Sequence, residues 1–143
     1  MQFTRASDYA VRVLSYLINA NGSVSRAQAI AGATDIPESF LAKILGQLCR
    51  SGLVRSHRGA RGGFSLAVDA NGINLLQVVE AMEGPLRLNL CDAPERCAYI
   101  DFCPIEKAWE KAEVTLRESL KEHKLADLAK QAAHANLFTK KAS

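Results

Sequence analysis

A glycine- and arginine-rich turn near the middle of the chain constrains its fold most strongly. The stretch 53–68 reads LVRSHRGARGGFSLAV, in which Leu53–His57 has the composition of a strand and Arg58–Gly63 contains three glycines. After the turn, apolar and polar residues alternate, with apolar positions at Phe64, Leu66 and Val68. Two extended runs joined by a short glycine-containing turn predict a β-hairpin. The segment before the hairpin indicates to which fold it belongs.

Three helical patterns precede the hairpin. The first has one apolar face and ends near Asn19–Gly22, and the second, RAQAIAGA, follows Ser25, which we expect to be its N-cap. After a break at Gly32–Ile36, Pro37 is expected in the first turn of the third helix, which Gly52 ends. Two short helices with a tight break between them predict a helix-turn-helix. A hairpin directly after it predicts a winged helix.

Three more helices are expected beyond the hairpin. Leu75–Glu83 reads as a helix that Gly84–Pro85 ends, and a longer helix runs from about Pro104 to Lys124. The run LADLAKQAAHANLF predicts a last, short helix. The long helix has one apolar stripe, formed by Ile105, Trp109, Ala112, Leu116 and Leu120. Such a stripe on a helix that projects from a small domain predicts pairing with a second copy of the chain.

Composition and charge narrow the functional classes. The chain has 143 residues, of which 48% are hydrophobic, and this suffices for one domain with a hydrophobic core. The net charge is +3, but residues 1–67 hold eight Lys and Arg against three Asp and Glu, a net charge of +5. The remaining residues have a net charge of −2. A basic first half suggests a surface that faces a polyanion.

Other functional classes lack a sequence signal. There is no glycine-rich nucleotide loop and no nucleophile elbow, so we do not expect an enzyme. The start, MQFTRASDYA, lacks the pattern of a signal peptide, and no apolar run approaches the length of a membrane span. We therefore expect a cytoplasmic protein that does not enter a membrane, in a compartment where disulfides are rare.

The predicted winged helix indicates which residues would contact DNA. Arg58 and Arg61 lie at the hairpin tip, where arginines suit phosphates or a narrow minor groove and glycines allow close approach. From the third helix, Ser39, Lys43 and Gln47 are candidates for contacts with base edges or phosphates. The alternative for the two arginines is an ordinary solvated turn.

Three of the four cysteines lie in CDAPERCAYIDFC, at Cys91, Cys97 and Cys103, with five residues between one and the next. Six residues advance a helix by roughly 600°, so a helix would spread the thiols about 120° apart. Pro94 and Pro104 also disfavour a continuous helix, which indicates a loop that can bring the sulfurs together. Cys49 differs, because it lies within the third predicted helix, where we expect a core position.

The loop suits an iron–sulfur cluster best, because clusters are held by cysteine thiolates and accept wide spacings. A structural zinc site usually needs four Cys or His ligands in close-spaced pairs, and the loop contains neither a CxxC motif nor a histidine. Zinc and unligated thiols remain the alternatives to a cluster.

These features together resemble the Rrf-two family of winged-helix transcription regulators. The resemblance rests on the helix-turn-helix, the wing GLVRSHRGARGGFSLA, the C-x5-C-x5-C loop and the long apolar helix, and extends from QFT to KLADLA. It implies a homodimer whose two winged helices bind a near-palindromic operator in double-stranded DNA. It also implies one iron–sulfur cluster per subunit on Cys91, Cys97 and Cys103, either 4Fe–4S, which we favour, or 2Fe–2S.

The fourth cluster ligand differs between subgroups of this family. IscR-type members use a histidine three residues after the last cysteine, a position that Glu106 occupies here. NsrR-type members use an aspartate near the start of the first helix of the other subunit, and this chain has Asp8 at that place. We favour the NsrR type, although a carboxylate near a helix N-terminus also has a purely structural explanation.

The resemblance implies a fold that is mainly α: a winged helix-turn-helix with a two-stranded wing and a long C-terminal dimerisation helix. We expect residues 1–83 to form the DNA-binding domain, 84–103 the cluster-binding loop, and 104–143 the dimerisation helix and tail. The expected function is a repressor that responds to nitric oxide, oxygen or redox state, or iron–sulfur status. The alternatives are an IscR-like regulator of cluster supply and a zinc-stabilised DNA-binding protein that senses nothing.

Overall fold

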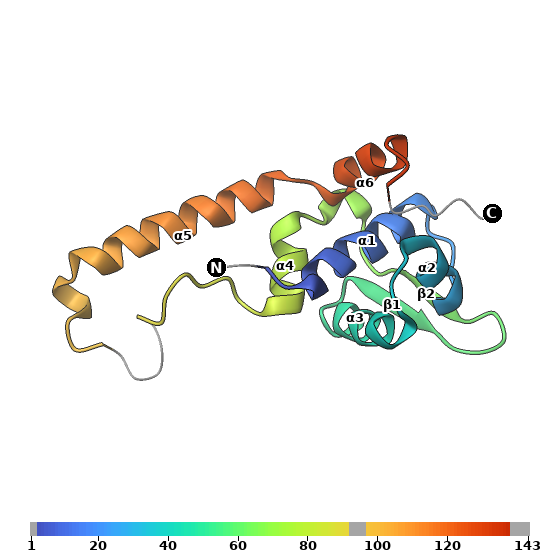
Figure 1. Cartoon of the computed structure of the whole chain (residues 1–143), viewed down its shortest axis with the longest axis horizontal. Helices are drawn as coiled ribbons and strands as arrows, with labels where there is room; N and C mark the ends of the chain where they lie inside the picture. Colours follow the sequence, from blue (N-terminus) through green and yellow to red (C-terminus); the bar gives the residue numbers. More distant parts are fainter. Residues whose placement is uncertain (1–2, 92–96, 138–143) are drawn as a thin grey trace.

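The computed structural model describes residues 3–91 and 97–137, which form a compact head and a projecting helix (Figure 1). The elements of these residues, in chain order, are α1 (Arg5–Asn19), α2 (Ala27–Thr34), α3 (Glu38–Arg50), β1 (Val54–His57), β2 (Gly63–Leu66), η1 (Ala70–Gly72), α4 (Leu75–Glu83), η2 (Ile100–Phe102), α5 (Pro104–Glu122) and α6 (Leu125–His134). The strands pair antiparallel with Val54 opposite Leu66 and His57 opposite Gly63. The predicted mainly α winged helix is confirmed.

One hydrophobic core holds the head together. Leu14 of α1 and Leu41 and Leu48 of α3 are almost completely buried in it, and each such leucine contributes about 1.5–3 kcal/mol through burial. Leu125 of α6 belongs to the same core, because α6 folds back onto α1. The last helix is therefore a structural part of the head, although it follows the long helix in sequence.

Side chains and glycines end the helices at their observed positions. Thr4 caps α1 by accepting a hydrogen bond from the N–H of Ala6, and Asn74 forms a reciprocal capping box with Gln77 at the start of α4. Gly52 follows α3 with a φ of +77°, a left-handed conformation that glycine adopts without steric cost. Pro37, which we expected in the first turn of α3, is the N-cap of this helix and lies one residue before the first turn.

The prediction that Ser25 caps α2 is wrong. The N-cap of α2 is Arg26, and its side chain makes no capping hydrogen bond. Ser25 is instead buried and extended, and its backbone pairs with Phe64 of β2 through two hydrogen bonds of 2.8 and 2.9 Å. Pairing with the wing fixes residue 25 as a short strand segment, so the helix starts later than its side chain suggests.

A second, smaller apolar cluster joins α4 to the C-terminal end of α5, and its buried residues are Leu76, Val79, Leu86 and Leu120. Toward its N-terminus, α5 leaves the head, and its apolar side chains are exposed: Ile105 by 64%, Trp109 by 45% and Val114 by 53%. Within the described part of the chain, no helix combines the length and hydropathy needed for a bilayer span.

The cysteine segment contains no α-helix in its described residues. Cys91 lies in a turn, and residues 97–103 contain only the short 3₁₀ turn Ile100–Phe102 before α5 begins at Pro104. The loop expected from the cysteine spacing is thus found on both sides of residues 92–96, which include Pro94 and lie outside the described residues.

Candidate DNA-binding surface and cysteine loop

The outward face of α3 carries some of the side chains predicted to contact DNA. Ser39 and Lys43 are exposed there, and Arg50, which the sequence analysis did not select, is exposed one turn beyond Gly46. Gln47 lies differently: it is half-buried, and its amide nitrogen is 3.5 Å from the carbonyl oxygen of Met82 in α4. The structure therefore places Ser39 and Lys43 on an accessible face and turns Gln47 toward α4.

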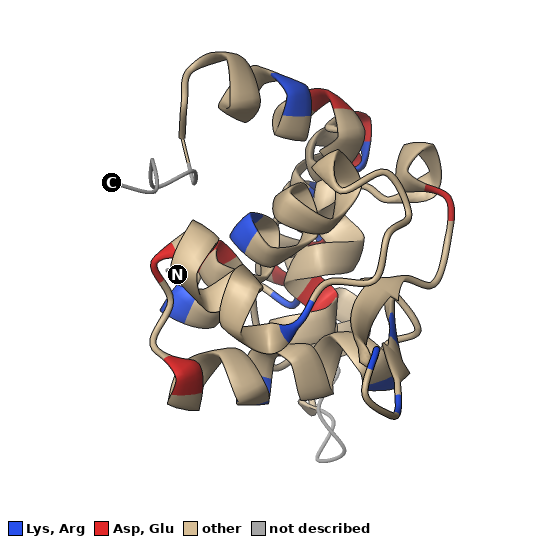
Figure 2. Ribbon diagram, turned by 90° about the vertical axis from the view of Figure 1, so that its right-hand side faces the viewer, with Lys and Arg blue, Asp and Glu red and all other residues tan. Residues whose placement is uncertain are grey.

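The wing presents its arginines at the tip. Arg58 and Arg61 are both exposed in the loop between β1 and β2, and exposed Arg55 adds another cation on β1. In Figure 2, Lys and Arg positions are blue, and several blue positions lie close together at the wing. At the base of the loop, the imidazole of His57 lies 2.8 Å from the Ser65 hydroxyl across the strands. The wing is thus a short, basic hairpin with a side-chain hydrogen bond between its two strands.

Two contacts that the sequence analysis missed hold the wing against the start of α2. The guanidinium of Arg26 donates a hydrogen bond of 2.9 Å to the carbonyl oxygen of Ala60, 34 residues away at the wing tip. At Gly63, a Cβ would lie 2.3 Å from the carbonyl oxygen of Ser25, so only glycine fits this close approach. Arg26 gave no local signal, because its partner is distant in sequence.

The start of α1 places Asp8 on the surface, in its first turn. The Asp8 carboxylate forms an ion pair of 2.8 Å with Arg12, one turn later, and the Arg12 guanidinium lies over the ring of Tyr9. Asp8 also lines a groove of about 240 Å³ whose other walls are largely apolar, including Phe3, Val11, Val79 and Leu120. The carboxylate is therefore accessible beside an apolar groove.

Glu83, the last residue of α4, fixes the start of α1. The sequence analysis did not predict this role. Its carboxylate accepts hydrogen bonds from the backbone N–H of Thr4 at 3.0 Å, the Thr4 hydroxyl, and the Ser7 hydroxyl at 2.6 Å. Burial raises the pKa of Glu83, but the hydrogen bonds from Ser7 and Thr4 together lower it below its usual value. Asp8 thus lies in a helical turn that is held from α4.

The three cysteines of the loop all precede α5, and Cys103 lies directly before its first residue, at the end of the helix that is far from the head (Figure 1). Cys97 is exposed, Cys91 and Cys103 are half-buried, and none of them forms a disulfide. In residues 3–91 and 97–137, no three His, Cys, Asp or Glu side chains lie close enough together to hold a metal ion. Glu106 is half-buried in the first turn of α5, close in sequence to Cys103.

Large apolar side chains accompany these cysteines on the surface. Leu90 is 83% exposed, Tyr99 77% and Phe102 90%. Large apolar side chains that are exposed to this extent often mark a contact with another molecule. The cysteine segment therefore has the character of a surface that becomes covered.

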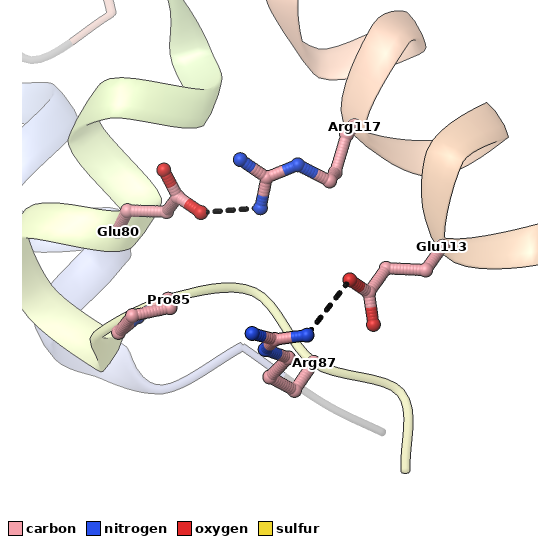
Figure 3. A pocket seen from close by; sticks show the side chains of 5 residues that line it. All are labelled: Glu80, Pro85, Arg87, Glu113 and Arg117. Atoms are coloured by element: carbon pink, nitrogen blue, oxygen red, sulfur yellow. Dashed lines mark hydrogen bonds and ion pairs between the residues drawn. The ribbon is translucent and has the colours of Figure 1, made fainter. Parts of the chain in front are cut away.

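An ionic network ties the segment before Cys91 to two helices. A cavity of about 460 Å³ lies between α4 and α5, and Figure 3 shows the side chains that line it: Glu80, Pro85, Arg87, Glu113 and Arg117. Arg117 binds Glu80 at 2.6 Å, and Arg87 lies 3.9 Å from Glu113. The same two carboxylates accept hydrogen bonds from the backbone of the segment, Glu80 from Leu86 and Glu113 from Leu88. The segment is thereby attached to both helices at alternate residues.

Cys49 lies apart from the other cysteines. It is a half-buried residue of α3 and lines a mostly apolar cavity of about 490 Å³ between α2, α3 and the wing. Burial raises the pKa of its thiol, an effect that the neighbouring Arg50 partly opposes. This environment resembles the apolar position expected from the sequence.

Comparisons with known proteins agree on one family. The family Rrf2, described as "Iron-dependent Transcriptional regulator", matches residues 3–131. Protein aau3 of Rhizobium meliloti (strain 1021) is 36% identical over 140 residues, which cover 96% of this chain and 91% of that protein. A protein of Mycobacterium tuberculosis (strain ATCC 25618 / H37Rv) that is named as an HTH-type transcriptional regulator is 34% identical over 134 residues. These residues cover 90% of this chain and 81% of that protein.

Solved structures share the fold. T. potens IscR has a TM-score of 0.71 and 27% identity, covering 96% of this chain and 92% of its own. CymR of B. subtilis, described as a global cysteine regulator, has a TM-score of 0.71 and 22% identity, covering 92% and 98% of the two chains. The chain therefore belongs to the Rrf2 family, the Rrf-two family of the sequence analysis, whose members are DNA-binding transcriptional regulators and not enzymes.

Proposed function

We propose that the chain is a cytoplasmic, homodimeric repressor that binds a near-palindromic operator and responds to nitric oxide or redox state through an iron–sulfur cluster. The observation that carries this proposal is the three-cysteine segment, which lies at the far end of α5 from the winged helix and exposes large apolar side chains. In this proposal, residues 1–83 bind DNA, 84–103 bind the cluster and 104–143 include the dimerisation helix.

A dimer explains the exposed stripe on α5. In this stripe, Ile105 and Trp109 are exposed and lie outside both cores, so burial against a second copy would remove them from water. A dimer of winged helices presents two reading heads, which is the arrangement that a two-fold symmetric operator requires.

DNA binding rests on α3 and the wing. Lys43 and Ser39 lie on the accessible face of α3, and Arg58 and Arg61 lie at the wing tip. In a winged helix docked through α3, the helix enters the major groove and the wing contacts the adjacent backbone. Gln47 remains a prediction, although its position toward α4 favours Ser39 and Lys43 over it.

The donor set of the loop fits an iron–sulfur cluster. Cys91, Cys97 and Cys103 provide three thiols outside disulfides, and thiolates are the ligands that such clusters require. Bound there, a 4Fe–4S or 2Fe–2S cluster supplies iron and sulfide that react with nitric oxide and oxygen. The family description "Iron-dependent Transcriptional regulator" and the likeness to T. potens IscR support this assignment.

Asp8 of the partner subunit is the fourth ligand that we propose. Within one chain, Asp8 lies on the head while Cys103 begins the far end of α5, so a ligand from the same chain would have to span that separation (Figure 1). In the dimer, the apolar groove beside Asp8 suits the exposed Tyr99 and Phe102 of the partner's loop. Glu106, near Cys103 in the same chain, is the alternative and corresponds to an IscR-like ligand position.

The network at Glu80 and Glu113 provides a path from the loop to the head. The segment that leads to Cys91 is hydrogen-bonded to both carboxylates, and α4 in turn holds the start of α1 through Glu83. A rearrangement of the loop would therefore alter how α4 and α5 meet, and with them the spacing of the two reading heads.

Purification without oxygen tests the proposal. The protein should be brown and contain iron and acid-labile sulfide, and Ala at Cys91, Cys97 or Cys103 should remove the colour. Cys49→Ala is the matched control and should leave the absorbance unchanged, because Cys49 lies in the head. Colourless protein with stoichiometric zinc would instead identify a zinc-stabilised DNA-binding protein.

Mixed dimers test the origin of the fourth ligand. If Asp8 acts across the dimer, combining Asp8→Ala subunits with Cys97→Ala subunits leaves one complete site per dimer. If Glu106 is the ligand, Asp8→Ala alone changes neither the absorbance nor the response of DNA binding to nitric oxide. Asp8→Ala should otherwise keep the dimer and lose the response.

A further inference from the structure

We propose that Arg26 is a positioning residue for the wing: its hydrogen bond to the carbonyl oxygen of Ala60 sets the wing tip so that Arg58 and Arg61 face DNA. The inference rests on the proposed DNA-binding function of the wing. It assigns a role to a residue at the start of α2 that no sequence motif marks.

The contact joins two distant parts of the chain at the functional end of the hairpin. Ala60 lies between Arg58 and Arg61, and its carbonyl oxygen accepts from the Arg26 guanidinium at 2.9 Å. The backbone bond from Gly62 to Gly59 closes the turn itself, whereas the Arg26 bond attaches the turn to the head. A charged donor also makes a stronger hydrogen bond than a neutral one.

The base from which Arg26 reaches the tip is rigid. Its neighbour Ser25 is buried and pairs with Phe64 through two backbone hydrogen bonds, and Gly63 is so close that a Cβ would clash with Ser25. Residue 26 is therefore held beside β2. The planar guanidinium can then fix the position of the Ala60 carbonyl relative to the head.

The tip needs such a constraint because of its glycines. Gly59 has a φ of +100°, and a Cβ at Gly62 would lie 2.4 Å from the carbonyl oxygen of His57, so the turn depends on residues that restrict the backbone little. Ordering a flexible turn and two long arginine side chains on DNA costs conformational entropy. A tip that is already held in the free protein reduces this cost.

A variant cycle separates positioning from direct contact with DNA. The probe is a mixed-sequence DNA duplex at low salt, and the variants are Arg26→Ala, Arg58→Ala/Arg61→Ala, and all three substitutions together. We expect Arg26→Ala to weaken binding about three- to tenfold, corresponding to one modest hydrogen bond. In the background without Arg58 and Arg61, it should cause no further loss.

Two controls accompany the cycle. Lys130→Ala removes the same charge from an exposed position of α6 and should change the affinity by less than about twofold, as expected for a charge distant from the proposed interface. Arg26→Met keeps the length of the side chain without a donor and should match Arg26→Ala. A further, additive loss in the triple variant would overturn the inference, because Arg26 would then contact DNA itself.

Hydrogen exchange of the free protein provides a readout without DNA. Arg26→Ala should accelerate exchange of the amides of residues 59–62, whereas Arg58→Ala/Arg61→Ala should not. Unchanged exchange in Arg26→Ala would overturn the positioning role even if the wing binds DNA. Wild-type DNA affinity of the Arg58→Ala/Arg61→Ala variant would instead overturn the wing function on which the inference rests.

Discussion

Truncation of Glu83 should destabilise the head at the junction of α1 and α4. The Glu83 carboxylate accepts three hydrogen bonds from Thr4 and Ser7, and Thr4 is the N-cap of α1. In Glu83→Ala, these donors lose a charged acceptor, and the positive end of the α1 dipole loses a nearby anion. The first turn of α1, which includes Asp8, should therefore loosen first.

The size of the effect follows from the number of bonds and their exposure. A hydrogen bond to a charged group contributes about 1.5–3 kcal/mol, but Glu83 is exposed, so we expect about 0.5–1 kcal/mol for each of the three. The free energy of unfolding should fall by about 2 kcal/mol. For a chain of this length, the corresponding decrease in Tm is about 4–8 °C.

The pH dependence gives a second, independent test with Glu83→Gln. Because the pKa of Glu83 is lowered in the folded protein, its charge stabilises the fold above the unfolded pKa of about 4.3. That stabilisation is lost as the pH falls through the lowered, folded-state pKa. The difference in stability between wild type and Glu83→Gln should thus be largest near neutral pH and shrink below about pH 4.

Thermal denaturation at a fixed protomer concentration measures both effects, since the Tm of a dimer depends on concentration. Glu118→Ala is the matched control: this exposed carboxylate forms an i, i+3 ion pair with Lys121 and should contribute at most about 1 kcal/mol. The reasoning is refuted if Glu83→Ala is no more destabilising than Glu118→Ala, or if Glu83→Gln and wild type keep a constant difference from pH 7 to pH 3.5.

Three further predictions concern the wing, the thiols and the dimer. Arg58→Ala/Arg61→Ala should reduce the salt dependence of DNA binding by up to about one unit per lost phosphate contact, and an unchanged slope would make both residues ordinary surface arginines. In metal-free protein, iodoacetamide should modify exposed Cys97 before Cys49, whose pKa is raised by burial; mass spectrometry showing the reverse order would contradict this. Trp109→Asp should weaken the dimer in sedimentation experiments, and an undiminished dimer would place the contact elsewhere than the exposed α5 stripe.

The sequence predicts the elements of this fold well, because their signals are local. Glycines, alternating apolar residues and a single apolar stripe indicate the wing and α5 within a few residues of their observed ends. Ser25 shows where local signals fail: its capping tendency competes with strand pairing to Phe64, 39 residues later, and the pairing prevails. The position of α6 on α1 likewise depends on a distant core that no short pattern describes.

The candidate site is less predictable than the fold. Residue type and spacing were enough to single out the cysteines and the wing arginines, because their chemistry is evident from single positions. The residues that support them, Arg26 and Glu83, act on partners at least 34 residues away and are ordinary surface residues by composition. The proposed fourth ligand, Asp8 of the partner subunit, belongs to a second copy of the chain, whose position a single sequence does not indicate.

The cysteine loop lies far along α5 from the place where this helix is attached to the head, and this distance relates the angle of the helix to the position of the thiols. Arg117 binds Glu80 close to the C-terminal end of the helix, and Cys103 precedes its first residue. At about 1.5 Å per residue, the helical rise puts roughly 21 Å between these two points. For a rigid helix that turns about the Arg117–Glu80 contact, a displacement of about 2 Å at the cysteines corresponds to a tilt of α5 by only about 5° relative to the head. A change of only a few degrees in the angle between α5 and the head therefore displaces the thiols by about 2 Å.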